Sequence, residues 1–425
     1  MPSTPSLSRR SLVAGGMALG GAATLAAERL GPTLSRAESL PAPPSPGSPS
    51  TPPAQRPRLF LPPMREDQIT DIKVCLRPFR AAGPRYDVEK LGDKTVFHHY
   101  GHGGSGWSLS WGSADFVVGR IAATLERRIA VIGCGIIGLT TALTALRAGM
   151  DVTIYTRDLL PRTRSVRANG SWTPSSRIAL ASVAGPAFPD LWERMARFSW
   201  ASYRSYLGLP GEPIMFLDTY RLADQRNEAK ANGEDHSAAP PPAQPGKDDF
   251  ARYNPRIRDI IPAAIELQPS ENPFPVPYAK RAAMMIFNFG AYGDHLLSEF
   301  HQSGGRIVMR EFHSPADLRH LPERVIVNCP GYAAHDWWQD RSLIPVRGQT
   351  TWLPPCPQGR YGVAYRGAEM LCKTDGIMVQ GYDLDDLGEM VGVGNAFEHP
   401  DRREAARAIG VFTDLFRRTA ASRSA

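Results

Sequence analysis

A glycine-rich turn at residues 133–138, Gly-Cys-Gly-Ile-Ile-Gly, limits the possible folds of this chain more than any other feature. It follows an apolar run at 128–132 that predicts a strand, and it opens a predicted helix at 137–148. Gly149 ends that helix before a second predicted strand at 151–155. Such a βαβ unit, with glycines that let the backbone approach a pyrophosphate, predicts dinucleotide binding in a Rossmann-like α/β fold. The alternative is a glycine cluster that serves packing alone.

Two charged residues follow the second strand of this unit. An acid about 20 positions after the turn commonly bonds the cofactor ribose, and Asp158 stands near that place. Arg157 precedes it, and an arginine there would suit a 2′-phosphate and hence NADP. The other interpretation of Arg157 is a solvated residue at a strand end.

A second glycine-rich segment, residues 100–112, lies upstream of the turn and contains five glycines among aromatic residues. Amides of a side-chain-free loop can approach a flat ring and stabilise negative charge on it. The alternative is an ordinary loop in which His102 is a structural hydrogen-bonding residue rather than a base. The flanking sequence predicts a strand at 72–76, ended by Arg77-Pro78, and a helix at 114–125.

Composition limits the class of protein. At 425 residues the chain can form two packed domains, and 21% charged residues is ordinary for a globular enzyme. Residues 1–65 carry seven arginines and two glutamates, which is +5 of the net charge of +7. The remainder therefore lacks the positive footprint of a nucleic-acid-binding protein. A polar stretch at 223–249 with three consecutive prolines predicts a surface loop.

The N-terminus has the pattern of an export signal. Arg9-Arg10 precedes a weakly apolar run of small residues from Leu12 to Ala27, which favours the twin-arginine route and an exported, periplasmic or extracellular protein. The alternatives are an ordinary basic signal and a short membrane anchor. We expect a signal over 1–35 and a Pro- and Ser-rich linker over 36–65.

The five cysteines, at positions 75, 134, 329, 356 and 372, lack metal-site spacing, and no metal is expected. They are interpreted as mostly buried apolar residues. One bridge in an oxidising compartment remains open, without an indication of which pair would form it.

Several segments together resemble the D-amino-acid oxidase family. They are Tyr100–Gly106 with Trp111-Gly112, Leu76–Arg80, Ala168–Pro174, and Val325–Cys329 with Gly331 and Pro345–Gln349. The resemblance covers most of residues 66–418, and the combination is specific although each piece alone is not. It implies a Rossmann-like FAD-binding domain with a parallel sheet and a substrate domain with a mixed or antiparallel sheet.

The order of these segments differs from the family's. There the arginine and histidine-glycine segments close the chain, whereas here they precede the βαβ unit. The resemblance therefore implies a circular permutation, which is feasible where chain ends lie close together. The expected FAD-binding domain spans 66–185 and returns at 301–350. The expected substrate domain spans 186–300 and 351–418.

The resemblance also implies site residues. Arg77 would pair with a substrate carboxylate, for which its planar fork is suited, unless it forms a surface salt bridge. Gly104 would contact the substrate as well. The residues expected to bind the cofactor are Gly103, Gly104, Ser105, Gly106, Trp107, Ser108, Gly133, Gly135, Ile137, Gly138, Arg157, Asp158, Thr163, Arg164, Ser165, Asn169, Gly170 and Ser171.

The implied activity is FAD-dependent oxidation of an amino acid, with a D-amino acid favoured. Hydride transfer from Cα to the flavin would give an imine, then a keto acid and ammonia, with oxygen or another acceptor reoxidising the flavin. Two tyrosines expected in the family are replaced near Arg366 and Met370, which puts the substrate in doubt. An inward Arg366 would favour an acidic substrate; otherwise it is solvated. Alternatives are a glycine- or sarcosine-type oxidase, a flavin dehydrogenase, an NAD(P) dehydrogenase and a non-catalytic flavin-binding protein.

Overall fold

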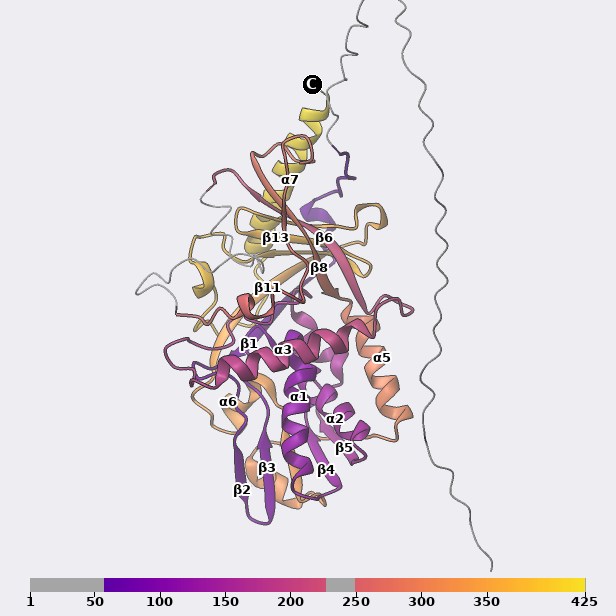
Figure 1. Cartoon of the computed structure of the whole chain (residues 1–425), viewed down its shortest axis with the longest axis vertical. Helices are drawn as coiled ribbons and strands as arrows, with labels where there is room; N and C mark the ends of the chain where they lie inside the picture. Colours follow the sequence, from indigo (N-terminus) through magenta and orange to yellow (C-terminus); the bar gives the residue numbers. More distant parts are fainter. Residues whose placement is uncertain (1–56, 227–248, 425) are drawn as a thin grey trace, which may run out of the picture. The chain divides into compact units, whose positions relative to one another are not determined.

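The fold is described from a computed structural model that places residues 57–226 and 249–424. The chain divides into two units, Met1–Pro53 and Ala54–Ala425, and everything below concerns the second (Figure 1). The predicted signal and most of the predicted linker and surface loop lie outside the described residues. Among the residues that are described, we find no helix with the length and apolar character needed to span a membrane.

The predicted βαβ unit forms the centre of a six-stranded sheet. Five of its strands are parallel, and the edge strand β2 pairs antiparallel with β3. In spatial order the strands are β2 (Val88–Leu91), β3 (Lys94–His98), β10 (Val325–Asn328), β4 (Arg128–Ile132), β5 (Asp151–Thr156) and β9 (Arg306–Met309).

Both faces of this sheet are buried at its central strands β10 and β4, which explains why these two strands are almost wholly apolar. Ile129 and Val131 of β4 pack in a core with α1 and α2, whereas Ala130 and Ile132 pack on the opposite face near α6. The α-helices among the described residues are α1 (Gly106–Ala122), α2 (Ile136–Arg147), α3 (Phe188–Arg204), α5 (Phe289–Gln302), α6 (Ala334–Trp337) and α7 (Arg402–Ser424).

The second sheet has eight strands and is mixed, because β12 and β6 pair in parallel while the other pairs are antiparallel. Its order is β1 (Asp71–Phe79), β11 (Ile344–Leu353), β14 (Gly376–Gly381), β13 (Ala368–Lys373), β12 (Gly362–Tyr365), β6 (Ile214–Ala223), β8 (Tyr278–Phe287) and β7 (Ile265–Glu266). The apolar face of α7 covers one side of it through Ile409, Phe412 and Phe416. The predicted class, a parallel-sheet α/β domain with a second mixed sheet, is confirmed.

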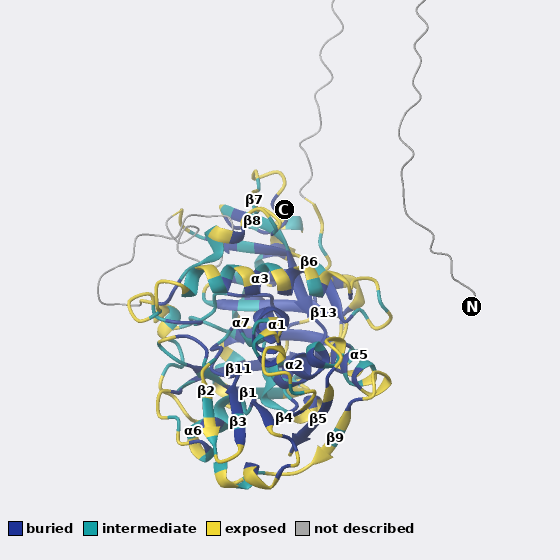
Figure 2. Ribbon diagram, turned by 60° about the horizontal axis from the view of Figure 1, so that its bottom comes forward, coloured by how far each residue is buried: buried dark blue, intermediate teal, exposed yellow. Residues whose placement is uncertain are grey.

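Helix α3 crosses α1 and has one buried side (Figure 2). Its buried residues, among them Trp192, Met195, Trp200 and Tyr203, recur at the spacing of one helical face. Gly112 of α1 lies against the Met195 backbone of α3, where a Cβ would collide with it. This glycine therefore serves close helix packing rather than a loop.

Two predicted boundaries, the start of α1 and the end of β1, were wrong. Helix α1 begins at Gly106, not at Ala114, because Gly106 and Gly112 are helical residues. Strand β1 does not end at Arg77-Pro78 but runs through Pro78 to Phe79. Proline is tolerated there because β1 is an edge strand, paired only with β11.

The sheets also divide differently from the predicted domain ranges at two strands. Both β1 and β11 lie in the eight-stranded sheet, although 66–185 and 301–350 were expected to form the FAD-binding domain. Antiparallel pairing of Asp71–Phe79 with Ile344–Trp352 holds them together. They bring Arg77 from the larger sheet toward the glycine turn of the smaller one.

Candidate functional site

A cavity of about 660 Å³ lies at the carboxyl ends of the parallel strands β4, β5 and β10. Its walls come from the glycine turn, the histidine-glycine segment, the strand β1, the 3₁₀ segment Arg164–Arg167 and residues 398–399. The volume is within the range of small-molecule sites, and the sheet edge is where doubly wound folds bind ligands. The cavity therefore joins both glycine segments that the sequence singled out.

The glycine turn is packed too closely for side chains at its glycines. A Cβ on Gly133 would stand 2.7 Å from the carbonyl oxygen of Cys329, and one on Gly135 would stand 3.0 Å from Ser165 Oγ. A Cβ on Gly138 would collide with the Gly133 carbonyl. The helix α2 begins directly after at Ile136, whose amide donates to Ser165 Oγ at 3.0 Å, and the next amides of its first turn have no partner within the helix. This arrangement fits a bound pyrophosphate.

Most of the predicted site residues line this one cavity. They are Arg77, Gly103, Gly104, Gly106, Trp107, Gly133, Gly135, Ile137, Arg157, Asp158, Thr163, Arg164 and Ser165. The resemblance requires these segments, which are spread over residues 77–165, to converge on one site. Their assignment to particular parts of a cofactor remains a prediction.

Six predicted residues lie outside the cavity lining: Ser105, Ser108, Gly138, Asn169, Gly170 and Ser171. The two serines of the first segment form internal bonds, since Ser105 Oγ donates to the Ser176 carbonyl at 2.9 Å and Ser108 Oγ accepts from Thr173 N at 2.7 Å. Asn169 Nδ2 donates to Glu369 at 3.3 Å. In this structure these residues support the walls of the site rather than face it.

The backbone of the histidine-glycine segment differs from the prediction in one respect. The amide of Gly103 donates to the Pro78 carbonyl at 2.8 Å, and that of Gly104 donates to the Ser176 carbonyl at 2.9 Å. Both amides are therefore occupied, and the expectation that they point at a flavin ring is wrong for this conformation. The donors left at this wall are the first-turn amides of α1, at Gly106 and Trp107, which have no partner within the helix.

Arg77 extends from β1 across the neighbouring strand β11. A Cβ on Gly348 would stand 2.5 Å from Arg77 Cζ, so the absence of a side chain at Gly348 gives the guanidinium its path. Arg77 lines the cavity together with Gly104. The geometry suits a carboxylate-binding arginine at one end of the site.

Arg157 and Asp158 lie at the end of β5, as predicted. Arg157 Nε donates to Asp158 at 2.7 Å, and its Nη1 donates to Glu311 at 3.2 Å. The Arg157 side chain is 66% exposed. An arginine already paired with two carboxylates on the surface is poorly suited to a 2′-phosphate.

One cavity residue that the sequence did not indicate is Glu398. Its carboxylate pairs with Arg164 Nη2 at 2.6 Å and with Arg167 Nη1 at 2.8 Å, which hold its pKa below the usual range. Glu398 belongs to the connection between β14 and α7, far from the arginines in sequence. No local motif marks it, because its role comes only from the tertiary contact.

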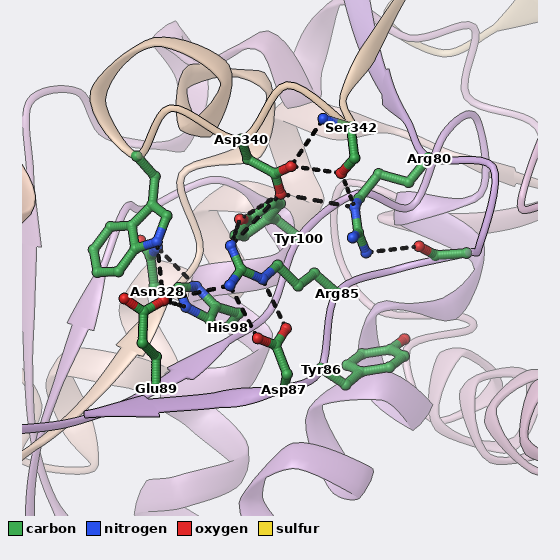
Figure 3. Close-up of polar contacts among 12 residues, drawn as sticks. Arg80, Arg85, Tyr86, Asp87, Glu89, His98, Tyr100, Asn328, Asp340 and Ser342 are labelled. Carbon is green, nitrogen blue, oxygen red and sulfur yellow. Dashed lines mark hydrogen bonds and ion pairs between the residues drawn. The ribbon is translucent and has the colours of Figure 1, made fainter. Parts of the chain in front are cut away.

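A charged network holds the segment that leads into the histidine-glycine turn (Figure 3). Arg85 donates to both Asp87 oxygens, at 2.7 and 2.9 Å, and to Tyr100 Oη at 2.8 Å. Tyr100 Oη in turn donates to Asp340 at 2.8 Å. His98, beside the network, contacts Glu89 at 3.0 Å. The network therefore ties β2 and β3 to the loop before β11.

Three buried histidines surround this wall of the site: His98, His99 and His102. Burial lowers the pKa of each of them, for His102 to about 3. The unfolded chain binds these protons near pH 6.5, whereas the folded chain does not, so their contribution to stability is present above pH 6.5 and is lost below it.

We therefore expect His102, whose pKa lies near 3, to lower the free energy of unfolding by about 2 kcal/mol between pH 7.5 and pH 5.0. Urea unfolding of the FAD-loaded protein at the two pH values measures this. His102→Gln should lose about 2 kcal/mol less than the wild type between them, and His320→Gln, at an exposed position, should lose as much as the wild type. Equal losses in the His102→Gln variant and the wild type would refute this assignment.

The positions near the two missing tyrosines lie away from the cavity lining. Arg366 is 57% exposed and pairs with Asp224 at 2.6 Å, so the inward orientation that would favour an acidic substrate is not seen. Met370 is fully buried in the core beneath α7. Among the described residues, no group of three or more His, Cys, Asp or Glu side chains is placed to hold a metal ion.

Comparison with known proteins identifies the class. Residues 128–422 match the family described as FAD dependent oxidoreductase, which is more than half of the chain. The chain belongs to this family, and FAD is its cofactor. This favours FAD over the nicotinamide cofactors that the glycine turn alone left open.

Individual relatives are more distant. The chain is 25% identical over 231 residues to a D-amino-acid oxidase of Rubrobacter xylanophilus, covering 54% of this chain and 59% of that protein. It is 26% identical over 226 residues to one of Dictyostelium discoideum, covering 52% and 55%. An iminodiacetate oxidase structure from Chelativorans sp. aligns with a TM-score of 0.48 at 18% identity, covering 69% and 80%. The chain thus spans little more than half of the curated relatives it matches.

Proposed function

We propose that this protein is an exported FAD-dependent oxidase of amino acids, with a D-amino acid as the favoured substrate. One observation carries the proposal: the glycine turn at Gly133 and the side chain of Arg77 line the same cavity. Two of the matched relatives carry the name D-amino-acid oxidase, which supports the choice of substrate class.

The residues of the chain would bind and orient rather than exchange protons. Arg77 would hold the substrate carboxylate through two parallel hydrogen bonds and so fix the position of Cα. His102 is uncharged at neutral pH because burial lowers its pKa to about 3, and it is unsuited to act as a general acid there. The first-turn amides of α1, including that of Trp107, would stabilise negative charge at this wall.

When bound, FAD would supply the oxidising ring that accepts a hydride from the substrate carbon. The substrate amine must be neutral for this, and the imine product would hydrolyse to a keto acid and ammonia. Oxygen would be the acceptor that yields hydrogen peroxide. Because the two tyrosines expected in the family have no counterpart near Arg366 and Met370, the substrate panel includes compounds other than D-amino acids.

A panel of D-, L- and N-methyl amino acids with glycine, assayed for peroxide and for ammonia or amine release, tests this proposal. We expect the highest kcat/KM for a D-amino acid. A preference for glycine or sarcosine would assign the alternative oxidase class. Oxidation with an artificial acceptor but not with oxygen would assign a dehydrogenase.

We also propose that the fold is a circular permutation of the family's. The family match begins at residue 128, the first residue of β4. The preceding residues 71–122 form α1 and three strands, of which β1 joins the eight-stranded sheet and β2 and β3 join the six-stranded sheet. Only five residues separate α1 from β4. A permutation also requires the end of α7 to lie close to the segment before β1. There, Arg423 Nη1 donates to the Leu59 carbonyl at 2.9 Å. The end of α7 therefore lies beside the segment that leads into β1.

A relinked variant tests the permutation: it starts at Arg128, joins Ser424 to Leu59 through a short Gly-Ser linker, and ends at Glu126. We expect it to fold and to bind FAD within about threefold of the native order, since the cut falls in the exposed 123–127 connection. A matched control opened inside α2 should not bind FAD. Loss of FAD binding in the relinked variant to the level of the control would contradict the proposal.

Export by the twin-arginine route is a further part of the proposal, supported by Arg9-Arg10 and the weakly apolar run after them. That route carries folded cargo, which suits a protein loaded with FAD before export. Replacing both arginines by lysine should retain the protein in the cytoplasm, whereas export of that variant through an ordinary secretion pathway would contradict the assignment.

A further inference from the structure

Two of the five cysteines meet near the end of β13, a central strand of the eight-stranded sheet. Cys372 lies in β13, and Cys356 precedes the short 3₁₀ turn Pro357–Gly359. Cys372 Sγ donates to the Cys356 carbonyl at 3.4 Å. Both sulfur atoms lie 3.5 Å from the position that a Cβ on Gly359 would occupy, so they are at most about 7 Å apart.

The two thiols share one buried environment. The Cys356 and Cys372 thiols both lie in the core beneath α7 with Tyr361, whose pKa burial and the two neighbouring thiols raise. The amide of Cys372 also donates to the Tyr361 carbonyl at 3.0 Å, which fixes the turn against β13. The other three cysteines line the cofactor cavity instead.

We propose that Cys356 and Cys372 are joined by a disulfide bond when the protein is in an oxidising compartment. A disulfide spans Cα atoms about 4.4–6.8 Å apart, and the sulfur atom of Cys372 already touches the backbone of Cys356. The inference does not depend on the substrate or on the oxidase activity.

The bond forms by exchange with a disulfide oxidant, either a small-molecule or a protein disulfide. Cys356 is 9% exposed and Cys372 is fully buried, so the Cys356 thiolate attacks the oxidant first and releases one thiol. The Cys372 thiolate then attacks the Cys356 sulfur and releases the second thiol. Two cysteine thiols thus give up two electrons and two protons, and one oxidant disulfide becomes two thiols. Burial raises the pKa of Cys372 to about 12, which makes the second step slow at neutral pH.

The position of the bond gives it a structural consequence. Pro62 packs against Gly359, and Tyr361 Oη donates to the Phe60 carbonyl at 2.8 Å. The turn that the bond would anchor is thus the surface on which residues 60–64 dock beside α7. The bond would secure the first described residues of the folded unit.

Mapping the thiols of the full-length protein tests the proposal directly. The FAD-loaded protein is equilibrated with oxidised glutathione, alkylated in denaturant, digested without reductant and analysed by mass spectrometry. We expect one cross-linked peptide pair, Cys356 with Cys372, and alkylation of Cys75, Cys134 and Cys329. Five alkylated cysteines, or Cys356 joined to another cysteine, would overturn the proposal.

Thermal unfolding supplies a second readout that does not need a variant to fold. Reduction should lower the Tm of the oxidised wild type by about 3–6 °C, because the bond closes a loop of about 15 residues. Cys356→Ala and Cys372→Ala should each have a Tm that reductant does not change. A reductant effect of wild-type size in either variant would assign the sensitivity to other cysteines and overturn the proposal.

Discussion

Gly133→Ala is expected to lower FAD affinity by about 5- to 100-fold, because the turn has no place for a methyl group. Gly133 has φ +97°, in the left-handed region that disfavours L side chains, and the added Cβ would stand 2.7 Å from the Cys329 carbonyl oxygen. That oxygen belongs to the backbone after β10 and cannot rotate away. Either the turn or the β10 end must move, and both form the cradle for the pyrophosphate.

Titration of the apoprotein with FAD, followed by flavin fluorescence, measures this loss. Gly119→Ala is the matched control, since Gly119 lies in α1 with nothing within 4 Å of the added Cβ. That variant should bind FAD as the wild type does. Circular dichroism and the Tm show whether the Gly133→Ala protein is folded, so that a loss of FAD affinity can be distinguished from unfolding. Wild-type affinity in a folded Gly133→Ala protein would refute the role of the turn.

Arg77→Ala is expected to reduce kcat/KM for the preferred amino acid between about 30-fold and several thousand-fold. The loss should fall on substrates with a carboxylate and should be much smaller for the corresponding amines, because Arg77 is proposed to bind that group alone. Arg77→Lys should recover only part of the activity, since lysine lacks the planar fork. FAD content should remain unchanged.

Two further variants sharpen the assignment of Arg77. Gly348→Ala should lower kcat/KM in the same selective way, because its Cβ would stand 2.5 Å from Arg77 Cζ and displace the guanidinium. Arg366→Ala should have no effect, since Arg366 is exposed and paired with Asp224. Equal kcat/KM for wild type and Arg77→Ala on a carboxylate substrate would contradict the proposed role.

The parallel-sheet half of the fold could be predicted from sequence because its signals are local. The strand at 128–132 and the glycine turn occupy consecutive residues, and β4 has the predicted bounds. The histidine-glycine segment was harder to interpret. Its pattern predicts a loop through Gly106 and Gly112, whereas both residues are helical. Gly112 is explained by its packing against the Met195 backbone of α3.

The polar partners within the site could not be predicted, because they also come from distant segments of the chain. Glu398 reaches Arg164 and Arg167 across more than 200 residues of sequence, and no spacing rule indicates such a contact. The hydrogen bonds that occupy the Gly103 and Gly104 amides also depend on partners from other segments. Sequence identified the segments that form the cavity, but the polar partners within it are set by tertiary packing.

The reaction of bound flavin with an amino acid under anaerobic conditions tests the central claim most directly. The full-length protein is purified with FAD bound, and its visible absorbance is followed during titration with D-, L- and N-methyl amino acids. We expect at least one D-amino acid to bleach the flavin completely, and oxygen to restore its absorbance with one peroxide per FAD. A flavin that stays oxidised with every amino acid would contradict the proposed oxidase activity and indicate a flavin-binding protein without it.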